Sequence, residues 1–288
     1  MNEMSPWARD GVHDFAQSQP AIPERVIAGR RQYRTIWISD VHLGTRGCNA
    51  EMLIDFLDHV DSEKMYLVGD IIDGWRLKKK LHWPAAHNDV VWRLLKRAKR
   101  GAEVIYIPGN HDEIVRQFCG LDFGGIAIRR DAMHETADGK KLLVLHGDEF
   151  DAIMLSHRWL AYVGDQAYEL MMALNRVVNA WRRLFRMPYW SLSKHAKARV
   201  KNAVEFISRY EEVVAQAAVH RGADGVVCGH IHTAEFREIG GVLYYNDGDW
   251  VEGCTALVEH FDGRMEVLHW ADEIAAREPA ADPVLLAA

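Results

Sequence analysis

The sequence predicts an α/β protein, and three features indicate it. Five short runs of β-branched and aromatic residues, the composition typical of buried strands, lie between residues 35 and 228. Apolar residues recur at helical spacing after the first two runs, over residues 50–60 and 88–100. Of the 288 residues, 49% are apolar, which is enough to bury a sizeable core. At about 150 residues per domain, the length indicates one large domain, with or without an insertion.

The expected strands occupy residues 35–38, 65–68, 104–107, 142–145 and 225–228. Two later runs, 241–245 and 255–261, precede an Asp-Gly turn, and we expect them to pair antiparallel in a second layer of sheet. Residues 1–34 are polar and contain prolines, which indicates a loosely ordered lead-in. Residues 271–288 are rich in Ala and Pro and are expected to form a flexible tail. Helical patterning without strand signal predicts a helical insertion over about residues 150–223.

Composition narrows the classes of protein that the chain can belong to. With 35 Lys and Arg against 41 Asp and Glu, the formal charge is -6, which argues against a general coat for nucleic acid. Four widely spaced cysteines show no metal-ligand spacing and favour a reduced cytosolic chain. The N-terminus lacks the pattern of a secretory signal. The longest apolar stretch, 159–181, carries three charged residues, too many for a bilayer span. We therefore expect a soluble, cytoplasmic protein.

Asp, His and Asn follow each of the five expected strands, usually beside glycine. The segments are SDVH at 39–42, GDIID at 69–73, GNHD at 109–112, HGD at 146–148 and GHIH at 229–232. Ligands of open α/β sheets bind beyond the carboxyl ends of the strands, so the five segments are expected at one edge. A single motif of this kind is a weak signal because Asp, Asn and Gly are common in turns. Five in succession are a strong signal for a shared site.

The side chains of these segments suit a pair of divalent cations. Alternate residues of an extended chain point the same way, so Asp40 with His42, and His230 with His232, each present two ligands. Carboxylate, imidazole and amide groups together favour Mn, Fe or Zn over Ca. If Asp70 bridges, the set divides into two sites of four ligands, namely Asp40, His42, Asp70 and His232, and Asp70, Asn110, His146 and His230.

The charge of such a centre predicts its chemistry. Two dications bring +4, and the two carboxylates among the ligands, Asp40 and Asp70, return -2. The remaining positive charge calls for an anion, and a phosphate group with a hydroxide fits. Ions about 3.5 to 4 Å apart clamp phosphoryl oxygens and activate water. The sequence therefore predicts two-metal hydrolysis at phosphorus.

These motifs resemble those of a known family. The series DxH, GDxxD, GNHD, HGD and GHxH is similar to the calcineurin-like metallophosphoesterases over about residues 35–270. SDVHLG, YLVGDIIDGW, YIPGNHD, GHIH and NDGDW resemble more narrowly the bacterial branch that contains UDP-2,3-diacylglucosamine diphosphatase. The resemblance implies an α/β/β/α sandwich of two sheets with a helical lid. It also implies a manganese pair, with iron or zinc as alternatives, held by the seven residues above, and a hydrolase of lipid A biosynthesis.

His111 departs from the narrower branch, whose diphosphatases usually have Arg there. Cleaving a pyrophosphate expels a phosphate monoester, whose second pKa of about 6 makes a general acid nearly unnecessary. Expelling an alkoxide, near the roughly 15.7 of bulk water, gains much from a protonated His. His111 therefore permits phosphomonoester or phosphodiester chemistry and places the chain nearer a paralogous subgroup.

Neighbouring residues are assigned roles around that chemistry. Asn110 and His111 are expected to stabilise the charge that develops on the phosphoryl group. Asp112 either orients His111 or caps a local turn. Asp73 and Asp148 either hold imidazole N–H groups or cap turns, and Asp148 is also a candidate for substrate contact.

The expected insertion carries a strongly basic segment with interleaved aromatic residues. Residues 175–201 contain eight Lys and Arg and no Asp or Glu. Such a mixture is typical of a lid that receives acyl chains and contacts an anionic membrane surface. It also fits an ordinary helical cap, or a nucleic-acid surface where bases stack on the rings. Lys194, Lys197 and Lys201 have helical spacing and would either face substrate phosphate together or form a solvated face.

The sequence as a whole predicts a di-metal phosphoester hydrolase, associated peripherally with the cytoplasmic face of the membrane through its lid. The expected substrate is an amphiphilic phosphate or diphosphate, first UDP-2,3-diacylglucosamine, giving UMP and a lipid monosaccharide phosphate. An alternative in the same class is a phosphomonoesterase or phosphodiesterase on other lipid or nucleotide phosphates. An alternative of another class is a non-catalytic binding module. Nothing in the sequence indicates an obligate protein partner, and nucleic acid is the least favoured partner.

Overall fold

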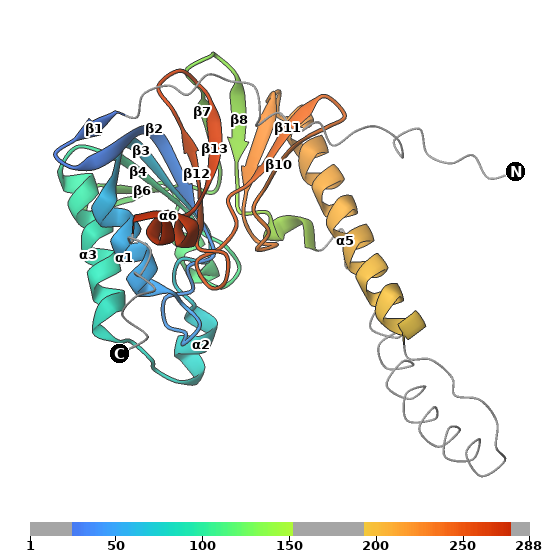
Figure 1. Cartoon of the computed structure of the whole chain (residues 1–288), viewed down its shortest axis with the longest axis horizontal. Coiled ribbons are helices and arrows are strands. Elements are labelled where there is room, and N and C mark those ends of the chain that lie inside the picture. Colours follow the sequence, from blue (N-terminus) through green and yellow to red (C-terminus); the bar gives the residue numbers. More distant parts are fainter. Residues whose placement is uncertain (1–24, 152–192, 278–288) are drawn as a thin grey trace, which may run out of the picture. The chain divides into compact units, whose positions relative to one another are not determined.

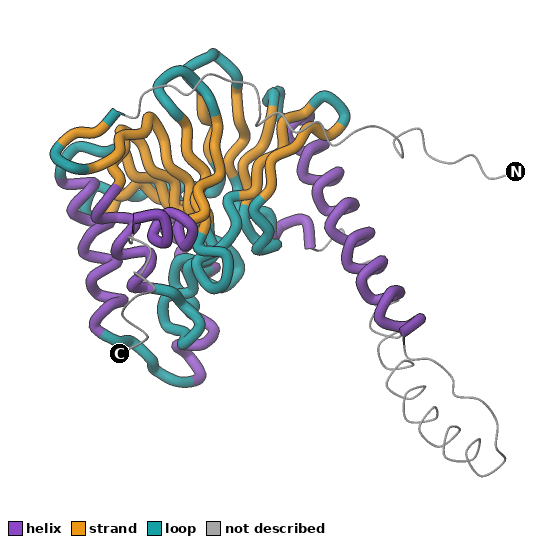
Figure 2. The backbone as a smooth tube through the Cα atoms, viewed as in Figure 1, coloured by secondary structure: helices purple, strands orange, loops and turns teal. Residues whose placement is uncertain are grey.

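Two mixed β-sheets form the centre of the fold (Figures 1 and 2). The structure is a computed structural model that describes residues 25–151 and 193–277, with side chains in the second range described from residue 207. The chain divides into two compact units, one of residues 1–148 with 215–288 and one of residues 149–214. Both sheets belong to the first unit.

The larger sheet has eight strands in the order β13-β12-β2-β3-β4-β6-β5, with β1 paired to β2. Neighbouring strands from β2 through β6 are parallel, whereas β12 pairs antiparallel with β2. The carboxyl ends of β2, β3 and β4 therefore meet at one edge. The strands are β1 (Val26–Ile27), β2 (Arg30–Ile38), β3 (Val60–Val68), β4 (Glu103–Ile107), β5 (Asp122–Phe123), β6 (Ile126–Ile128), β12 (Thr255–Glu259) and β13 (Met265–His269).

The smaller sheet has five strands in the order β10-β11-β9-β8-β7. Its three central strands are parallel, and the two edge strands are antiparallel to their neighbours. The carboxyl ends of β8 and β9 lie side by side as a result. The strands are β7 (Ala132–Glu135), β8 (Lys141–Val144), β9 (Gly225–Cys228), β10 (Glu235–Ile239) and β11 (Val242–Asn246).

One face of the larger sheet is covered by helices α1 (Ala50–His59), α3 (Ala85–Lys99) and α6 (Trp270–Arg277), as Figure 1 shows. Leu53, Phe56 and Leu57 of α1 are buried, because apolar residues three and four apart share one helix face. Full burial of each such side chain contributes about 1.5–3 kcal/mol. The Phe56 ring packs edge-on against Trp270 with ring centroids 5.0 Å apart.

The other face of the larger sheet packs against the smaller sheet. The core between them includes Trp37 and Tyr66 from the larger sheet and Val144 and Val227 from the smaller one. The Trp37 and Tyr66 rings stack with centroids 5.6 Å apart. The remaining described helices are α2 (Gly74–Lys79), η2 (Glu113–Phe118), η3 (Asp148–Phe150) and α5 (Ser193–His220). Among the helices that the structure describes, none has the length and apolar character needed to cross a membrane.

The α/β class, the five expected strands and the two expected helices are confirmed, but one strand pairing is wrong. β11 lies in the smaller sheet and β12 in the larger one, and the Asp-Gly turn joins β12 to β13. Alternating apolar residues mark a strand but do not select its partner, which explains the error. β2 begins at Arg30 and α6 extends to Arg277, so ordered structure reaches into the expected lead-in and tail. Most of the expected insertion lies outside the described residues.

Candidate metal centre

The seven residues predicted to bind metal all follow strands whose carboxyl ends meet. Asp40 and His42 come after β2, Asp70 after β3 and Asn110 after β4. The others follow the smaller sheet, where His146 comes after β8, and His230 and His232 after β9. Backbone hydrogen bonds tie neighbouring segments together, since the His42 N–H donates to the Asp70 carbonyl at 2.8 Å. The two sheets thus deliver their polar loops to one place.

The backbone of this region adopts a conformation that side chains normally avoid. Seven non-glycine residues in the described part of the chain have a positive φ, and five of them are predicted ligands. The five are Asp40, His42, Asp70, His230 and His232, with φ between 48° and 71°. Left-handed backbone is unfavourable for residues with a Cβ. Such conformations gather at functional sites, where the surrounding structure holds them in place.

One group of ligand atoms surrounds Asp40. His232 Nε2 lies 3.1 Å from Asp40 Oδ1, and His42 Nε2 lies 3.8 Å from the same oxygen. His42 Nε2 is also 3.9 Å from Asp70 Oδ2. Atoms that bind one ion at about 2.0–2.2 Å stand roughly 3–4 Å from one another. Asp40, His42, Asp70 and His232 are thus brought close together, as the first of the two predicted sites requires.

The second group surrounds Asp70 and His146. His146 Nε2 lies 3.5 Å from Asp70 Oδ2, and the His146 and His230 rings meet edge-on with centroids 5.2 Å apart. The Nδ1–H of His146 donates to the Val68 carbonyl at 2.9 Å, which turns Nε2 toward Asp70. Metal-binding histidines are usually oriented in this way through their second nitrogen.

Four of the predicted ligand atoms are buried without a hydrogen-bond partner. They are Asp40 Oδ1, His42 Nε2, Asn110 Oδ1 and His146 Nε2. Leaving a buried polar atom unpaired costs about 1–3 kcal/mol, so four together at one place require a common explanation. Divalent cations at this position would satisfy all four atoms, and the donor set of carboxylate, imidazole and amide oxygen fits them.

The electrostatics of the centre favour bound cations. Burial alone would raise the pKa of Asp70, but His146 and the His111 N–H outweigh it and hold that pKa well below its usual range. Burial would lower the pKa of His146, whereas Asp70 and Asp40 raise it to about 10. The pKa of Asp40 is also lowered, so the carboxylates of Asp40 and Asp70 are both charged at neutral pH. The imidazole of His146 must lose its proton when a metal binds.

Two glycines leave space for the ligands. A Cβ on Gly109 would lie 2.3 Å from Asp70 Oδ1 and 2.6 Å from His146 Nε2. A Cβ on Gly229 would lie 2.6 Å from Asp40 Oδ2. Backbone therefore approaches the ligands more closely than any side chain would permit.

His111 stands beside the centre and contacts a carboxylate other than the one expected. Its Nδ1 lies 3.1 Å from Asp73 Oδ2, while its Nε2 is 4.0 Å from Asp70 Oδ2. The same Asp73 oxygen is 3.4 Å from His42 Nδ1, and the other Asp73 oxygen caps α2 through the Arg76 N–H. The Trp75 ring packs on His111 with centroids 4.3 Å apart. Of the two roles predicted for Asp73, the helix cap is found as a hydrogen bond, and the second carboxylate oxygen also faces the two imidazoles.

Of the two roles expected for Asp112, its hydrogen bonds fit the local one and not the orientation of His111. Its carboxylate accepts hydrogen bonds from the Ile71 N–H at 2.8 Å, the Gly109 N–H at 2.6 Å and the Tyr106 hydroxyl. Asp112 therefore braces the loops after β3 and β4 against each other. A turn-forming acid and an imidazole-binding acid have the same sequence signature, so only the fold separates them.

For the four residues expected to contact substrate, the structure gives no support for that role. Asp148 forms a two-pronged ion pair with Arg116, with both its oxygens 2.7 Å from Nη2, so its charge is already matched. Lys194, Lys197 and Lys201 fall in the part of α5 whose side chains lie outside the described residues.

Sequence reasoning missed a buried pair behind Asp40. The Ser39 hydroxyl lies 2.6 Å from Asp40 Oδ2 and 2.7 Å from Asp247 Oδ1. Asp247 is fully buried, and burial raises its pKa well above the usual value. A protonated Asp247 can donate to Ser39, which leaves the Ser39 proton for Asp40. The NDGDW segment was the signal available, but its contact with Ser39 spans more than two hundred residues.

Comparison with known proteins agrees with this geometry. The profile of calcineurin-like phosphoesterases matches residues 33–234. UDP-2,3-diacylglucosamine hydrolase of Blochmanniella pennsylvanica is 21% identical over 216 residues, 71% of this chain and 81% of that protein. The enzyme of the same name from Aliivibrio fischeri is 30% identical over 118 residues, 39% of this chain and 47% of that protein.

Among solved structures, zinc-bound Vps29 of Entamoeba histolytica is similar to this chain with a TM-score of 0.40 and 12% identity. The match covers 82% of this chain and 98% of that one. The match to the family profile spans most of the chain and includes all seven predicted ligands. The chain therefore belongs to the calcineurin-like phosphoesterase family.

Proposed function

We propose that the chain is a two-metal phosphoesterase whose seven predicted ligands each bind metal. The observation that carries this proposal is the convergence of four buried, unpaired ligand atoms at the carboxyl ends of both sheets. One ion would be held by Asp40, His42, Asp70 and His232, and the other by Asp70, Asn110, His146 and His230. When bound, such ions supply an activated water and positive charge for the phosphoryl oxygens. Manganese is the first candidate, with iron and zinc as alternatives.

His111 is assigned the role of general acid. Asp73 Oδ2 lies 3.1 Å from Nδ1 and would favour the doubly protonated ring, whose Nε2–H would then be offered to the leaving oxygen. Trp75 covers one face of the ring and limits its rotation. Asn110 and His111 also stabilise the charge that develops on the phosphoryl group.

The proposed substrate is an amphiphile with a phosphate or diphosphate group. Two relatives bear the name UDP-2,3-diacylglucosamine hydrolase, which supports that diphosphate, cleaved to UMP and a lipid monosaccharide phosphate, as the first candidate. The identities of 21% and 30% also fit a paralogue with another lipid phosphate. A role in lipid A biosynthesis follows only if the first candidate is right.

A second candidate, a phosphomonoesterase or phosphodiesterase, is favoured by the contact of His111 with Asp73. An oriented His is useful for expelling an alkoxide and gives little advantage for expelling a phosphate monoester. The two candidate functions differ in how strongly the rate of hydrolysis depends on His111 for a given leaving group. If the second candidate is right, His111→Gln slows hydrolysis of alkyl phosphates about 100-fold or more and hardly affects the diphosphate.

The deciding experiment is mass spectrometry of products from three substrates with Mn present. The substrates are UDP-2,3-diacylglucosamine, a lipid monophosphate and a cyclic nucleotide. Exclusive release of UMP supports the diphosphate, whereas cleavage of the cyclic nucleotide alone overturns the lipid assignment. No turnover of any substrate by metal-loaded protein would favour the non-catalytic binding module. Asn110→Ala is the control, because it removes a predicted ligand and must abolish turnover.

The peripheral membrane contact through the basic insertion remains part of the proposal. Its support is the sequence of residues 175–201, with eight cations and interleaved aromatic rings. Replacing residues 175–193 by a Gly-Ser linker is expected to reduce turnover of the lipid substrate and sedimentation with anionic vesicles. Unchanged turnover and sedimentation would instead fit a helical cap whose aromatic residues pack on one another.

A further inference from the structure

A group of cations lines a hollow at the end of the larger sheet away from the candidate metal centre. Arg30 begins β2, whereas Arg93, Lys96, Arg97 and Arg100 belong to the end of α3 or follow it. The hollow also borders the end of α1, through Leu57 and Asp58. β2 has nine residues and is about 30 Å long at roughly 3.3 Å per residue, and the hollow and the metal centre lie at its opposite ends.

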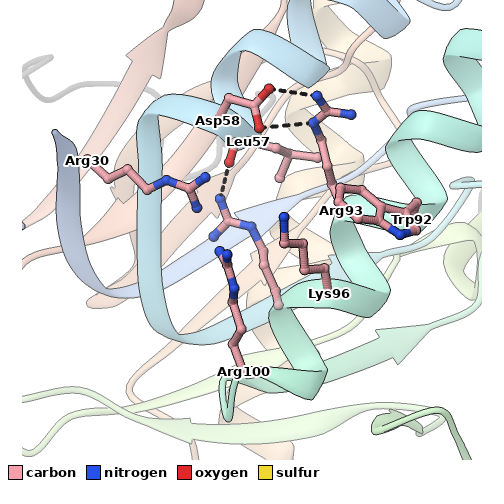
Figure 3. Close-up of a pocket in the computed structure, with 8 residues that line it drawn as sticks. Arg30, Leu57, Asp58, Trp92, Arg93, Lys96 and Arg100 are labelled. Atoms are coloured by element: carbon pink, nitrogen blue, oxygen red, sulfur yellow. Dashed lines mark hydrogen bonds and ion pairs between the residues drawn. The ribbon is translucent and has the colours of Figure 1, made fainter. Parts of the chain in front are cut away.

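Figure 3 shows how these side chains lie in the hollow. The charged ends of Arg30, Lys96 and Arg100 point toward the same space between β2, α1 and α3. Trp92 flanks that space, and the ammonium group of Lys96 lies 4.2 Å from the centre of its ring. Three donors from two elements therefore line one hollow.

Acidic neighbours neutralise only part of the charge. Arg93 makes a two-pronged contact with Asp58 at 2.7 and 3.0 Å. Asp61 is shared by Arg97 at 3.3 Å and Arg30 at 3.8 Å. Within the described part of the chain, neither Lys96 nor Arg100 has a carboxylate within 4.0 Å. Five cations against two carboxylates leave three positive charges unmatched.

Structural roles account for some of the cations but not for all. Arg97 is buried and donates to the Leu57 and Val60 carbonyls, so it fastens α3 to the end of α1. Cations in the last turn of a helix interact favourably with its dipole, which covers Lys96. Arg30 comes from a strand and adds to the same positive field. Burial is the main reason that the pKa of Arg97 is lowered to about 10, with Asp61 opposing this change and Arg30 adding to it.

We propose that Arg30, Lys96 and Arg100 form a binding site for a phosphate group, separate from the metal centre. Guanidinium groups bind phosphate oxygens with two parallel N–H bonds, and Lys adds a point charge. The buried guanidinium group of Arg97, held by two carbonyls, adds positive charge next to the site. The phosphate belongs either to a small soluble molecule or to a phospholipid headgroup, since the same oxygens are presented in both.

The test measures binding of inorganic phosphate to the full chain by calorimetry at constant ionic strength set with chloride. It uses His230→Ala protein beside the unsubstituted protein, because phosphate bound at the metal centre would otherwise be counted. We expect saturable binding of one phosphate in the His230→Ala background. Adding Arg30→Gln and Arg100→Gln should weaken it at least tenfold. Arg97 is left in place because it is buried and fastens α1.

A matched control removes two cations elsewhere. Lys140→Gln with Arg264→Gln changes the net charge by the same amount at two distant turns and should leave phosphate binding unchanged. Phosphoesterase activity is expected to survive the Arg30 and Arg100 substitutions, so failure of this site and failure of the proposed function are distinguishable. The proposal is overturned if phosphate binds equally well without Arg30 and Arg100, or if no saturable binding remains in the His230→Ala background.

Vesicles identify the source of the phosphate. The same proteins are sedimented with vesicles of phosphatidylcholine alone and with vesicles that also contain phosphatidylglycerol. Sedimentation that depends on Arg30 and Arg100 assigns the site to a phospholipid headgroup. Binding of inorganic phosphate without such sedimentation assigns it to a soluble phosphate.

Discussion

Gly109 decides how closely the backbone can approach the metal ligands. We expect Gly109→Ala to fold but to bind Mn about 10–100-fold more weakly, because its Cβ would displace the Asp70 carboxylate and the His146 ring. Calorimetric titration of metal-stripped protein with Mn measures this change. Gly139→Ala is the control for Mn affinity: nothing lies within 4 Å of its added Cβ, so it should leave the affinity unchanged even though its φ of +86° makes the substitution costly for folding. An unchanged affinity for Gly109→Ala would show that the ligands are not held as described.

Asp73 lies between the proposed acid His111, the predicted ligand His42 and the start of α2. Asparagine keeps the helix cap at nearly the same stability but loses the charge that holds His111. We therefore expect Asp73→Asn to lower kcat for an alkyl phosphate about tenfold or more, with little change for an aryl phosphate whose leaving group needs no proton. Comparing kcat for the two esters checks this. Equal losses for both would point to a general disturbance of the centre.

At the scale of elements, Asp112 ties the loop after β3 to the loop after β4. Asp112→Ala leaves the buried Ile71 and Gly109 N–H groups without an acceptor, at about 1–3 kcal/mol each. We expect the free energy of unfolding in urea to fall by about 2–4 kcal/mol. Asp122→Ala, in the exposed edge strand β5, removes only the acceptor of the exposed Gly125 N–H and should lower it by no more than about 1 kcal/mol. Similar values for both variants would contradict the bracing role.

Glu259 of β12 joins the two sheets through buried polar contacts. It accepts hydrogen bonds from Arg34 and Thr35 of β2, and its Oε2 lies 3.0 Å from Nε2 of His134 in β7. Burial alone would raise the pKa of Glu259, but His134, the Ala137 N–H and Arg34 outweigh it and lower that pKa. The ionised form is therefore favoured by folding.

The lowered pKa of Glu259 predicts how the stability of the fold depends on pH. A lowered folded-state pKa gives a stabilisation that is complete above the unfolded-state value of about 4.3. The stabilisation is lost as pH falls through the lower folded-state value. Urea unfolding between pH 7 and pH 3 should therefore show a decline below about pH 4 that is less steep in Glu259→Gln. An equally steep decline in that variant would assign the acid sensitivity to other carboxylates.

Across the whole molecule, the two ends of the larger sheet have opposite electrostatic characters. The carboxyl ends of β2 to β4 carry carboxylates and imidazoles that suit cations, whereas the amino ends border a group of Arg and Lys side chains with fewer carboxylates, which suits anions. Parallel strands make this separation possible because each places its two ends at opposite edges.

The sequence predicts the α/β class and the residues that converge, because both depend on local patterns. A strand-like run followed by Asp or His, with Gly usually nearby, occurs five times in the sequence. Asp40, Asp70 and His146 are therefore recognisable without the fold. The strand that pairs with β11 cannot be recognised from the sequence, because a strand with alternating apolar residues fits either sheet. The contact between Ser39 and Asp247 is likewise determined only by tertiary structure. Asp112 shows that residue type alone does not separate a bracing acid from a catalytic one.

The stoichiometry of Mn binding tests the central claim most directly. Metal-stripped protein is titrated with Mn while hydrolysis of an aryl phosphate is followed in the same sample. The account predicts two ions per chain, with activity absent from the stripped protein and restored as the second ion binds. Asn110→Ala should keep the site around Asp40 and lose the second ion. Binding of fewer than two ions to the unsubstituted chain, or full activity without metal, would contradict the account.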